Sequence, residues 1–255
     1  MRALPTGHSI GARTVRGVIS NCTARSRMCA LRSERCVLPT AAFCRPSRAD
    51  ERALRGILVR MVAAPILKMN EHEYLAWERE QSGKHQYIDG EVYAMSGGSA
   101  RHSLLSFQAA YVLKLAYGKG PCRPFTSDLQ VYIPVTGNYV YPDVSVVCGT
   151  LEQKNDTDAV TNPSVLIEVL SKSTEAHDRG GKWRDYQSIA SLQDYLLIAQ
   201  HEARIEHFQR TSSGPWTYYV YYAGDRIVLG NGATLALDEI YEGAFDIPVR
   251  DESPL

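Results

Sequence analysis

The sequence predicts an α/β (α+β) domain in which helices pack on a mixed central sheet. Three observations lead to this prediction. The 255 residues are 44% hydrophobic and 22% charged, which is ordinary for a globular domain that can bury a sizeable core. Short apolar runs rich in β-branched and aromatic residues recur along the chain. Near the middle of the chain, a helical segment lies between two such runs. This order is typical of a sheet in which a helix connects two strands and packs on the sheet.

The first sixty residues differ from the rest of the chain. They hold twelve arginines, no lysine and three acidic residues, a formal charge of +9, whereas residues 61–255 carry −9. Four of the six cysteines also lie there, without the closely spaced pairs of a zinc module. We expect residues 1–60 to be a disordered extension or the result of a misassigned start, and residues 61–255 to form a single domain. A basic nucleic-acid-binding arm and an organelle-targeting peptide are the alternatives.

The first elements are predicted between residues 69 and 149. Asn70 and Glu73 form a capping-box pattern that begins a short helix. Asp89-Gly90 between β-favouring residues indicates a hairpin. Apolar side chains at near-helical spacing predict a long helix over 99–117. Two extended segments follow, at 122–133 and 139–149, with the turn-like PVTGN between them.

The second half contains more strands than helices. The apolar run VLIEVL, after a polar loop, indicates a buried strand. Three further strands and two helices are predicted, the strands at 194–200, 203–210 and 216–222 and the helices at 175–189 and 237–243. Cys122 and Cys148 are expected to be small, buried apolar side chains. The sequence has no run of eighteen apolar residues, so we expect a cytoplasmic protein without a membrane span.

Glu168 is unusual because it interrupts the apolar run VLIEVL. Burying a lone carboxylate costs several kcal/mol unless it is paired, hydrogen-bonded or bound to a metal. Asp143 lies in another apolar strand, and adjacent strands bring side chains within a few ångströms on one face. Carboxylate oxygens are preferred by hard cations such as Mg²⁺ and Mn²⁺. The two acids therefore predict a metal site that could activate water and offset the charge of a phosphoryl group.

Lys182 lies in the helix predicted after the Glu168 strand. Asp178, Lys182 and Tyr186 recur at i, i+4 and i+8, so they share one stripe of that helix. A helix folded back on the sheet could bring this stripe near Glu168, where a positive group would stabilise charge developing on a phosphodiester. The alternatives are that Lys182 pairs only with Asp178, that Glu168 pairs with an arginine, and that Lys172 is the functional lysine.

A proline-aspartate pair, a later E-V in an apolar strand and a lysine resemble the PD-(D/E)xK nuclease pattern, although Leu170 occupies the usual lysine position. The wider region from residue 69 to 245 is similar to the bacterial Uma-type family of restriction-endonuclease-like proteins. The segments that carry this similarity are YIDGEVYAMSG, SDLQVYI, YPDVSVV and IEVLSKSTEAHDRGGKWRDYQ. In that family the lysine lies in the helix after the strand. The resemblance implies a restriction-endonuclease-like mixed sheet flanked by helices.

The resemblance also implies roles for individual residues. Asp143 and Glu168 match the metal-binding acids, Lys182 matches the relocated lysine, and Glu91 matches a further possible metal ligand. Asp128 and Tyr186 match recurrent positions with supporting roles. One departure is Gly181, where a charged residue is expected before the lysine. Independently of the family, Glu91 could be an exposed hairpin residue, and Asp128 and Asp143 could be turn residues.

These residues predict a Mg²⁺- or Mn²⁺-dependent endonuclease that hydrolyses DNA, and RNA hydrolysis would use the same metal chemistry. The alternative is a catalytically inactive nuclease fold that serves as a binding or assembly module, such as a homodimer. The −9 charge of residues 61–255 favours this alternative, because phosphate contact normally needs a basic face. Basic groups that could still line one groove are Arg101, Lys172, Arg179, Lys182 and Arg184. His102 and His177 have no partner at metal-ligand spacing and are expected to be structural.

Overall fold

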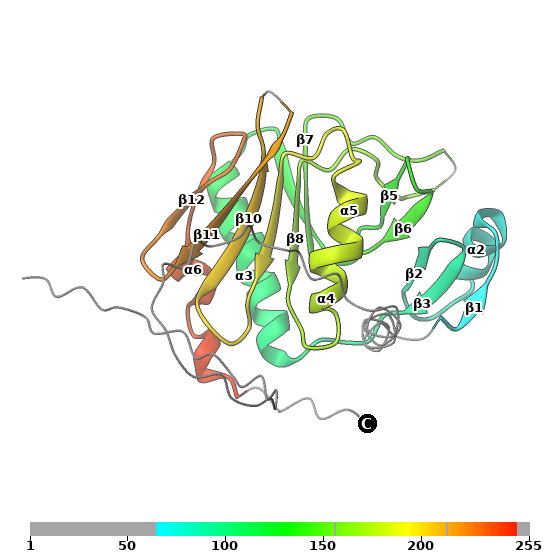
Figure 1. The fold of residues 1–255 in the computed structure, drawn as a ribbon, viewed down its shortest axis with the longest axis horizontal. Helices are drawn as coiled ribbons and strands as arrows, with labels where there is room; N and C mark the ends of the chain where they lie inside the picture. Colours follow the sequence, from blue (N-terminus) through cyan, green and yellow to red (C-terminus); the bar gives the residue numbers. More distant parts are fainter. Residues whose placement is uncertain (1–64, 156, 213, 249–255) are drawn as a thin grey trace, which may run out of the picture. The chain divides into compact units, whose positions relative to one another are not determined.

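A six-stranded mixed sheet is central to the computed structural model, which describes residues 65–155, 157–212 and 214–248 (Figure 1). The extension predicted at 1–60 lies outside these residues. The strand order is β11-β10-β9-β8-β7-β4. Their bounds, in chain order, are β4 Cys122–Thr126, β7 Val144–Cys148, β8 Val165–Val169, β9 Asp194–Ile198, β10 Arg204–Arg210 and β11 Trp216–Tyr222. Only β8 and β9 run parallel within this sheet, so the predicted mixed α/β architecture is confirmed.

Helices cover both faces of this sheet, which explains why most side chains of its central strands are apolar. On one face lie α3 (Ala100–Tyr117) and α6 (Leu237–Tyr241), and on the other lie α4 (Glu175–His177) and α5 (Trp183–Tyr186) (Figure 1). The side chains of β8 alternate between the two cores. Ile167 packs with the α3 core, whereas Leu166 packs with the α5 core. By the same alternation Glu168 points to the α5 face.

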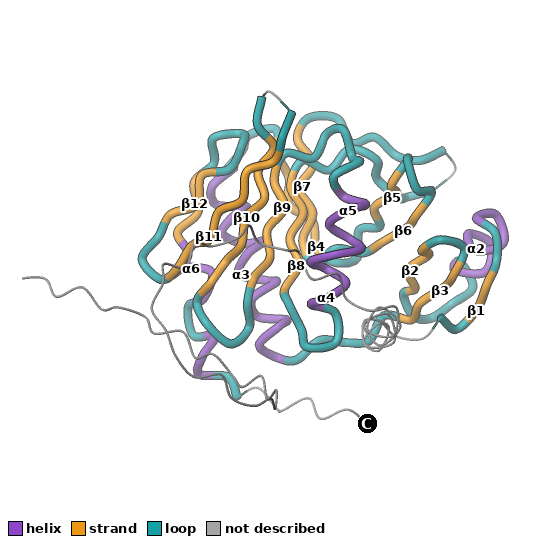
Figure 2. The backbone as a smooth tube through the Cα atoms, in the orientation of Figure 1, coloured by secondary structure: helices purple, strands orange, loops and turns teal. Residues whose placement is uncertain are grey.

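A smaller five-stranded sheet lies beside α2 (Glu71–Glu78) in the order β1-β3-β2-β6-β5 (Figure 2). The bounds are β1 Leu67–Lys68, β2 His85–Ile88, β3 Glu91–Ala94, β5 Val131–Ile133 and β6 Asn138–Val140. Asn70 and Glu73 cap α2 reciprocally, which confirms the predicted capping box. Asp89 and Gly90 both have positive φ, 52° and 82°, as the two-residue turn of the predicted hairpin requires.

The structure corrects three of the predicted elements. Each extended segment of the middle region divides between the two sheets: 122–133 becomes β4 and β5, and 139–149 becomes β6 and β7. The helix predicted over 175–189 is interrupted by a π-helical turn, η1 (Asp178–Lys182), between α4 and α5. Near the end of the described chain, Asn231-Gly232 lies in the turn of a separate hairpin, β12 (Arg226–Val228) with β13 (Thr234–Ala236), and η2 (Ala244–Asp246) follows α6.

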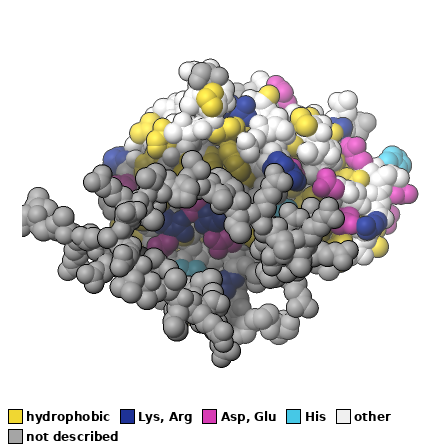
Figure 3. Space-filling view, viewed as in Figure 1, with side chains coloured by type: hydrophobic (Ala, Val, Ile, Leu, Met, Phe, Trp, Pro, Cys, Tyr) yellow, Lys and Arg dark blue, Asp and Glu magenta, His cyan; other side chains and the backbone are white. Residues whose placement is uncertain are grey.

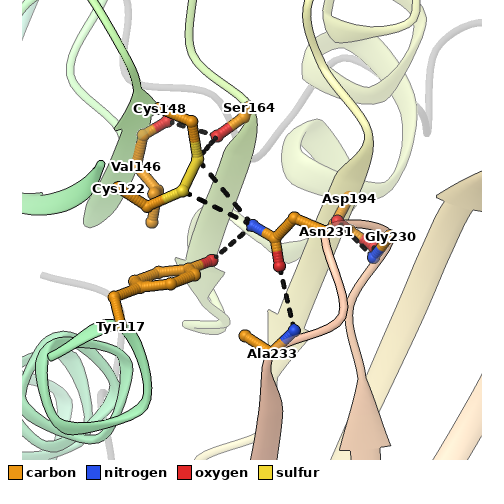
Figure 4. The surroundings of a disulfide bond; sticks show 9 residues. All are labelled: Tyr117, Cys122, Val146, Cys148, Ser164, Asp194, Gly230, Asn231 and Ala233. Atoms are coloured by element: carbon orange, nitrogen blue, oxygen red, sulfur yellow. Dashed lines mark hydrogen bonds between the residues drawn. A yellow bond between two sulfur atoms is a disulfide. The ribbon is translucent and has the colours of Figure 1, made fainter. Parts of the chain in front are cut away.

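Cys122 and Cys148 form a disulfide, so the expectation that they are separate apolar side chains was wrong (Figure 4). They are directly opposite each other in the β4–β7 ladder, which brings their side chains together on one face of the sheet. The amide nitrogen of Asn231 lies within 4.0 Å of both sulfurs, and the hydroxyl of Ser164 lies 3.3 Å from the Cys148 sulfur. The two cysteines are 26 residues apart, and only the strand register makes them neighbours. Their spacing in the sequence therefore did not indicate the disulfide.

The described helices include none that is both long and apolar enough to cross a membrane.

Candidate functional site

Glu168 is buried near the end of β8, with 3% of its surface exposed. Its Oε1 lies 3.0 Å from the Nζ of Lys182 and accepts a hydrogen bond of 2.8 Å from the Tyr186 hydroxyl. Both partners come from the segment that packs on this face of the sheet. The acid in the apolar strand is therefore compensated by a lysine and a tyrosine, and not by an arginine.

The π-helical turn η1 places Asp178 and Lys182 side by side. Lys182 Nζ lies 2.9 Å from Asp178 Oδ1 as well as 3.0 Å from Glu168, so one lysine serves two buried acids. A β-carbon added to Gly181 in this turn would lie 2.8 Å from the His177 ring, which already fills that space. The departure noted at Gly181 thus has a steric reason in this chain. Single π turns of this kind recur at functional sites.

Asp143 immediately precedes β7, next to Pro142. Val144 is opposite Ile167 in the β7–β8 ladder, so the next position along each strand brings Asp143 towards Glu168. The Oδ2 of Asp143 accepts a 2.7 Å hydrogen bond from the backbone N–H of Val169, which fixes the carboxylate beside β8. The two acids thus meet across adjacent strands.

Asp143, Glu168 and Lys182 all line one cavity of about 440 Å³. The loop between β3 and α3 forms another part of its wall, together with His102 at the start of α3. The remaining polar lining includes hydroxyl, imidazole and amide side chains, from Ser171, Ser173, Thr174, His177 and Gln200. The structure therefore brings the three main predicted site residues to a single space that a small group can enter.

Two other predicted residues lie elsewhere. Glu91 forms an ion pair of 2.6 Å with Lys68 and accepts a hydrogen bond from the Tyr93 hydroxyl. The side chain of Asp128 is 86% exposed and pairs with Lys84 at 2.9 Å. Neither acid is among the described residues that line the cavity. The third supporting candidate, Tyr186, does contact the site through Glu168.

His102 is a site residue that the sequence interpretation missed. Its Nε2 lies 3.2 Å from Asp143 Oδ2, and its ring lines the cavity. The contact joins the start of α3 to the end of a loop forty-one positions later. Because it depends on how α3 packs against the sheet, no local spacing in the sequence indicates it.

Acidic groups outnumber basic groups in this cluster. Burial raises the pKa of Glu168 to about 8, with Lys182 opposing the shift and Asp178 and Asp143 adding to it. Burial would lower the pKa of Lys182, but the charges of Glu168 and Asp178 outweigh it and raise that pKa. Burial also opposes protonation of His102, yet its hydrogen bond with Asp143 raises its pKa above the ordinary value. The cluster therefore favours an additional positive charge.

The donor atoms fit a hard divalent cation. Asp143 Oδ2 and Glu168 Oε1 are used in the contacts given above, whereas Asp143 Oδ1 and Glu168 Oε2 accept no hydrogen bond from the described part of the chain. Among described residues, no group of three or more His, Cys, Asp or Glu side chains could hold a metal. The protein would thus offer two carboxylates. Mg²⁺ suits such a site because it is commonly bound through one or two carboxylates and keeps several waters.

Comparison with known proteins identifies the family. The family Uma2, described as "Putative restriction endonuclease", matches residues 72–249. The chain belongs to the Uma2 family. The match confirms the resemblance seen in the sequence, and it spans every cavity residue named above.

Relatives of this Uma2 protein share most of its length. The Synechocystis protein slr1290 is 42% identical over 182 residues, which cover 71% of this chain and 95% of that protein. A second Synechocystis protein, sll1609, is 38% identical over 160 residues, 61% of this chain and 89% of its own length. A crystal structure from Anabaena variabilis, described as "a putative nuclease belonging to DUF820", aligns with a TM-score of 0.58 and 15% identity. It covers 69% of this chain and 99% of the Anabaena chain, and it establishes the shared fold.

Proposed function

We propose that this Uma2 protein is an endonuclease that hydrolyses phosphodiester bonds in DNA and depends on Mg²⁺ or Mn²⁺. The observation that carries the proposal is the arrangement of Asp143, Glu168 and Lys182 around one cavity. Two carboxylates on adjacent strands and a buried lysine are the groups that this reaction needs. Membership of the Uma2 family supports the same reaction class.

Each residue has a separate role in this proposal. Asp143 and Glu168 would hold the cation, which when bound supplies a Lewis acid for the phosphoryl group and lowers the pKa of water. Lys182 keeps a positive charge in the cavity, where it offsets negative charge that develops on the phosphate. Tyr186 orients Glu168 by donating to Oε1, so that the carboxylate keeps one direction relative to the cavity.

The charges around the site favour a second candidate, the catalytically inactive binding or assembly module. Two of the arginines expected to line a groove are engaged within the protein. Arg101 donates to the backbone carbonyls of Gln200 and Ile247, and Arg179 pairs with Glu175 and Glu206. On the visible described surface in Figure 3, basic side chains lie interspersed with acidic ones. Tight DNA binding that relies on a basic face would need other groups.

A cleavage assay separates the two candidates. The full chain is incubated with supercoiled plasmid, or with RNA, in Mg²⁺, Mn²⁺ or EDTA. We expect metal-dependent cleavage of DNA that falls at least 100-fold in Glu168→Gln and in Lys182→Met. The exposed side chains Glu80 and Lys119 provide matched controls, and Glu80→Gln and Lys119→Met should cleave like the wild type.

The outcomes have different meanings. Cleavage that survives both site substitutions would contradict the assignment of Glu168 and Lys182. A folded wild-type protein that neither binds Mn²⁺ nor cleaves either nucleic acid would favour the binding or assembly module. Cleavage of RNA alone would keep the site but replace the substrate.

A further inference from the structure

His102 is held between a glycine and the candidate metal-binding acid Asp143. We infer that His102 is a positioning residue that turns the Asp143 carboxylate towards the cavity, and that Gly98 is required because it leaves room for the His102 ring. The inference rests on the proposed function, because it assigns these residues a purpose in binding the cation.

Two contacts meet on one carboxylate oxygen of Asp143. Asp143 Oδ2 accepts the N–H of Val169 at 2.7 Å and lies 3.2 Å from His102 Nε2. His102 Nε2 lies at ion-pair distance from Oδ2, and an imidazole N–H is a group from which a carboxylate oxygen can accept. The Val169 N–H and the His102 ring thus both hold Oδ2 and leave Oδ1 for another partner.

Gly98 limits where the His102 ring can lie. A β-carbon added to Gly98 would lie 2.7 Å from His102 Nδ1 and 2.8 Å from its Cγ, closer than real side chains approach. The ring is therefore confined by Gly98 on one side and meets Asp143 on the other. Gly97 differs, because a β-carbon there would meet nothing within 4 Å. Of these two adjacent glycines, only Gly98 must lack a side chain to make room for the ring.

The backbone at the start of α3 holds His102 in place. The backbone N–H of His102 donates to the hydroxyl of Ser99, the residue that caps the start of α3. The ring thus extends from the first turn of an eighteen-residue helix, whose own packing determines where the imidazole lies. Groups that orient a metal-binding carboxylate in this way typically change metal affinity 10- to 100-fold when removed.

The test compares variants that separate hydrogen bonding from volume. His102→Leu fills similar space without a donor, and His102→Gln keeps an N–H donor. Gly98→Ala pushes the ring away without changing any polar group, with Gly97→Ala as its matched control. Isothermal titration of Mn²⁺ into each full-length protein gives the affinity, and thermal unfolding in EDTA monitors the fold.

We expect a Kd for Mn²⁺ that rises about 10- to 100-fold in His102→Leu and Gly98→Ala. His102→Gln and Gly97→Ala should stay near the wild-type value. Wild-type affinity in His102→Leu, or an equal loss in His102→Gln and His102→Leu, would overturn the inference while leaving the metal site intact. Absence of Mn²⁺ binding by the wild type would instead remove the proposed function and this inference together. If His102→Leu does not fold, the comparison of Gly98→Ala with Gly97→Ala decides.

Discussion

Replacing Lys182 with methionine is expected to destabilise the protein, and the loss should grow with pH. Lys182 Nζ lies 3.0 Å from Glu168 and 2.9 Å from Asp178, and all three residues are buried. Methionine keeps a long flexible side chain but carries no charge. Loss of the Lys182 charge leaves Asp178 without its cation, and breaking a buried ion pair in this way costs about 3–5 kcal/mol.

The pH dependence of this loss follows from Glu168. The ordinary pKa of its carboxyl is 4.5, and burial raises it to about 8 in the folded protein. Between these values the folded chain binds more protons than the unfolded chain, so the free energy of unfolding falls as the pH rises. In the wild type this fall ends near pH 8. Lys182 lowers the pKa of Glu168, so its loss should raise that pKa. The free energy of unfolding should then continue to fall above pH 8, at about 1.4 kcal/mol per pH unit.

Urea unfolding followed by tryptophan fluorescence at pH 7 and pH 9, in EDTA, measures both quantities. We expect Lys182→Met to lose about 3 kcal/mol at pH 7 and roughly 1–2 kcal/mol more at pH 9. The extra loss should vanish in the double variant Glu168→Gln/Lys182→Met, because glutamine does not titrate. The exposed control Lys119→Met should stay within about 0.5 kcal/mol of wild type. A loss below about 1 kcal/mol at both pH values, or a pH effect that persists in the double variant, would contradict the role of Lys182 as the cation that compensates the buried acids.

Three further predictions concern stability. Tyr186→Phe removes a hydrogen-bond donor from buried Glu168 and should lower the free energy of unfolding, measured by urea unfolding, by about 1.5–3 kcal/mol. A change near zero would show that this hydrogen bond does not contribute to stability. Reduction of the Cys122–Cys148 disulfide, which closes a loop with a sequence separation of 26, should cost about 3 kcal/mol, whereas a variant with both cysteines changed to serine should be insensitive to reductant. A chain begun at Met61 should melt at the same temperature as the full chain, and loss of folding would contradict the expectation that residues 1–60 lie outside the domain.

The parts of the fold that depend on local sequence were predictable. Asn70 with Glu73 specifies a helix start, and Asp89-Gly90 specifies a hairpin turn, because the contacts involved span only a few residues. Glu168 was recognisable as a site candidate for a similar reason. A charge inside a short apolar strand needs a partner, whichever partner the fold supplies.

Features that depend on distant contacts were not predictable in the same way. The split of residues 122–133 between two sheets reflects which strands pair, and the Cys122–Cys148 disulfide follows from that pairing. His102 reaches Asp143 only after α3 packs on the sheet. The π-helical turn is equally hidden, since the i, i+4 spacing of Asp178 and Lys182 predicts the same stripe on an ordinary helix. In each case the spacing of residues in the sequence indicated the local element correctly. It did not indicate which distant part of the chain that element contacts.

A crystal structure of the protein soaked with Mn²⁺, with anomalous scattering to locate the ion, tests the proposed metal site. We expect an anomalous peak in the cavity within about 2.0–2.3 Å of an oxygen of Asp143 and an oxygen of Glu168, and its loss in Glu168→Gln. A well-ordered cavity without a peak, or Mn²⁺ bound only elsewhere, would contradict the claim that these two acids form a metal site.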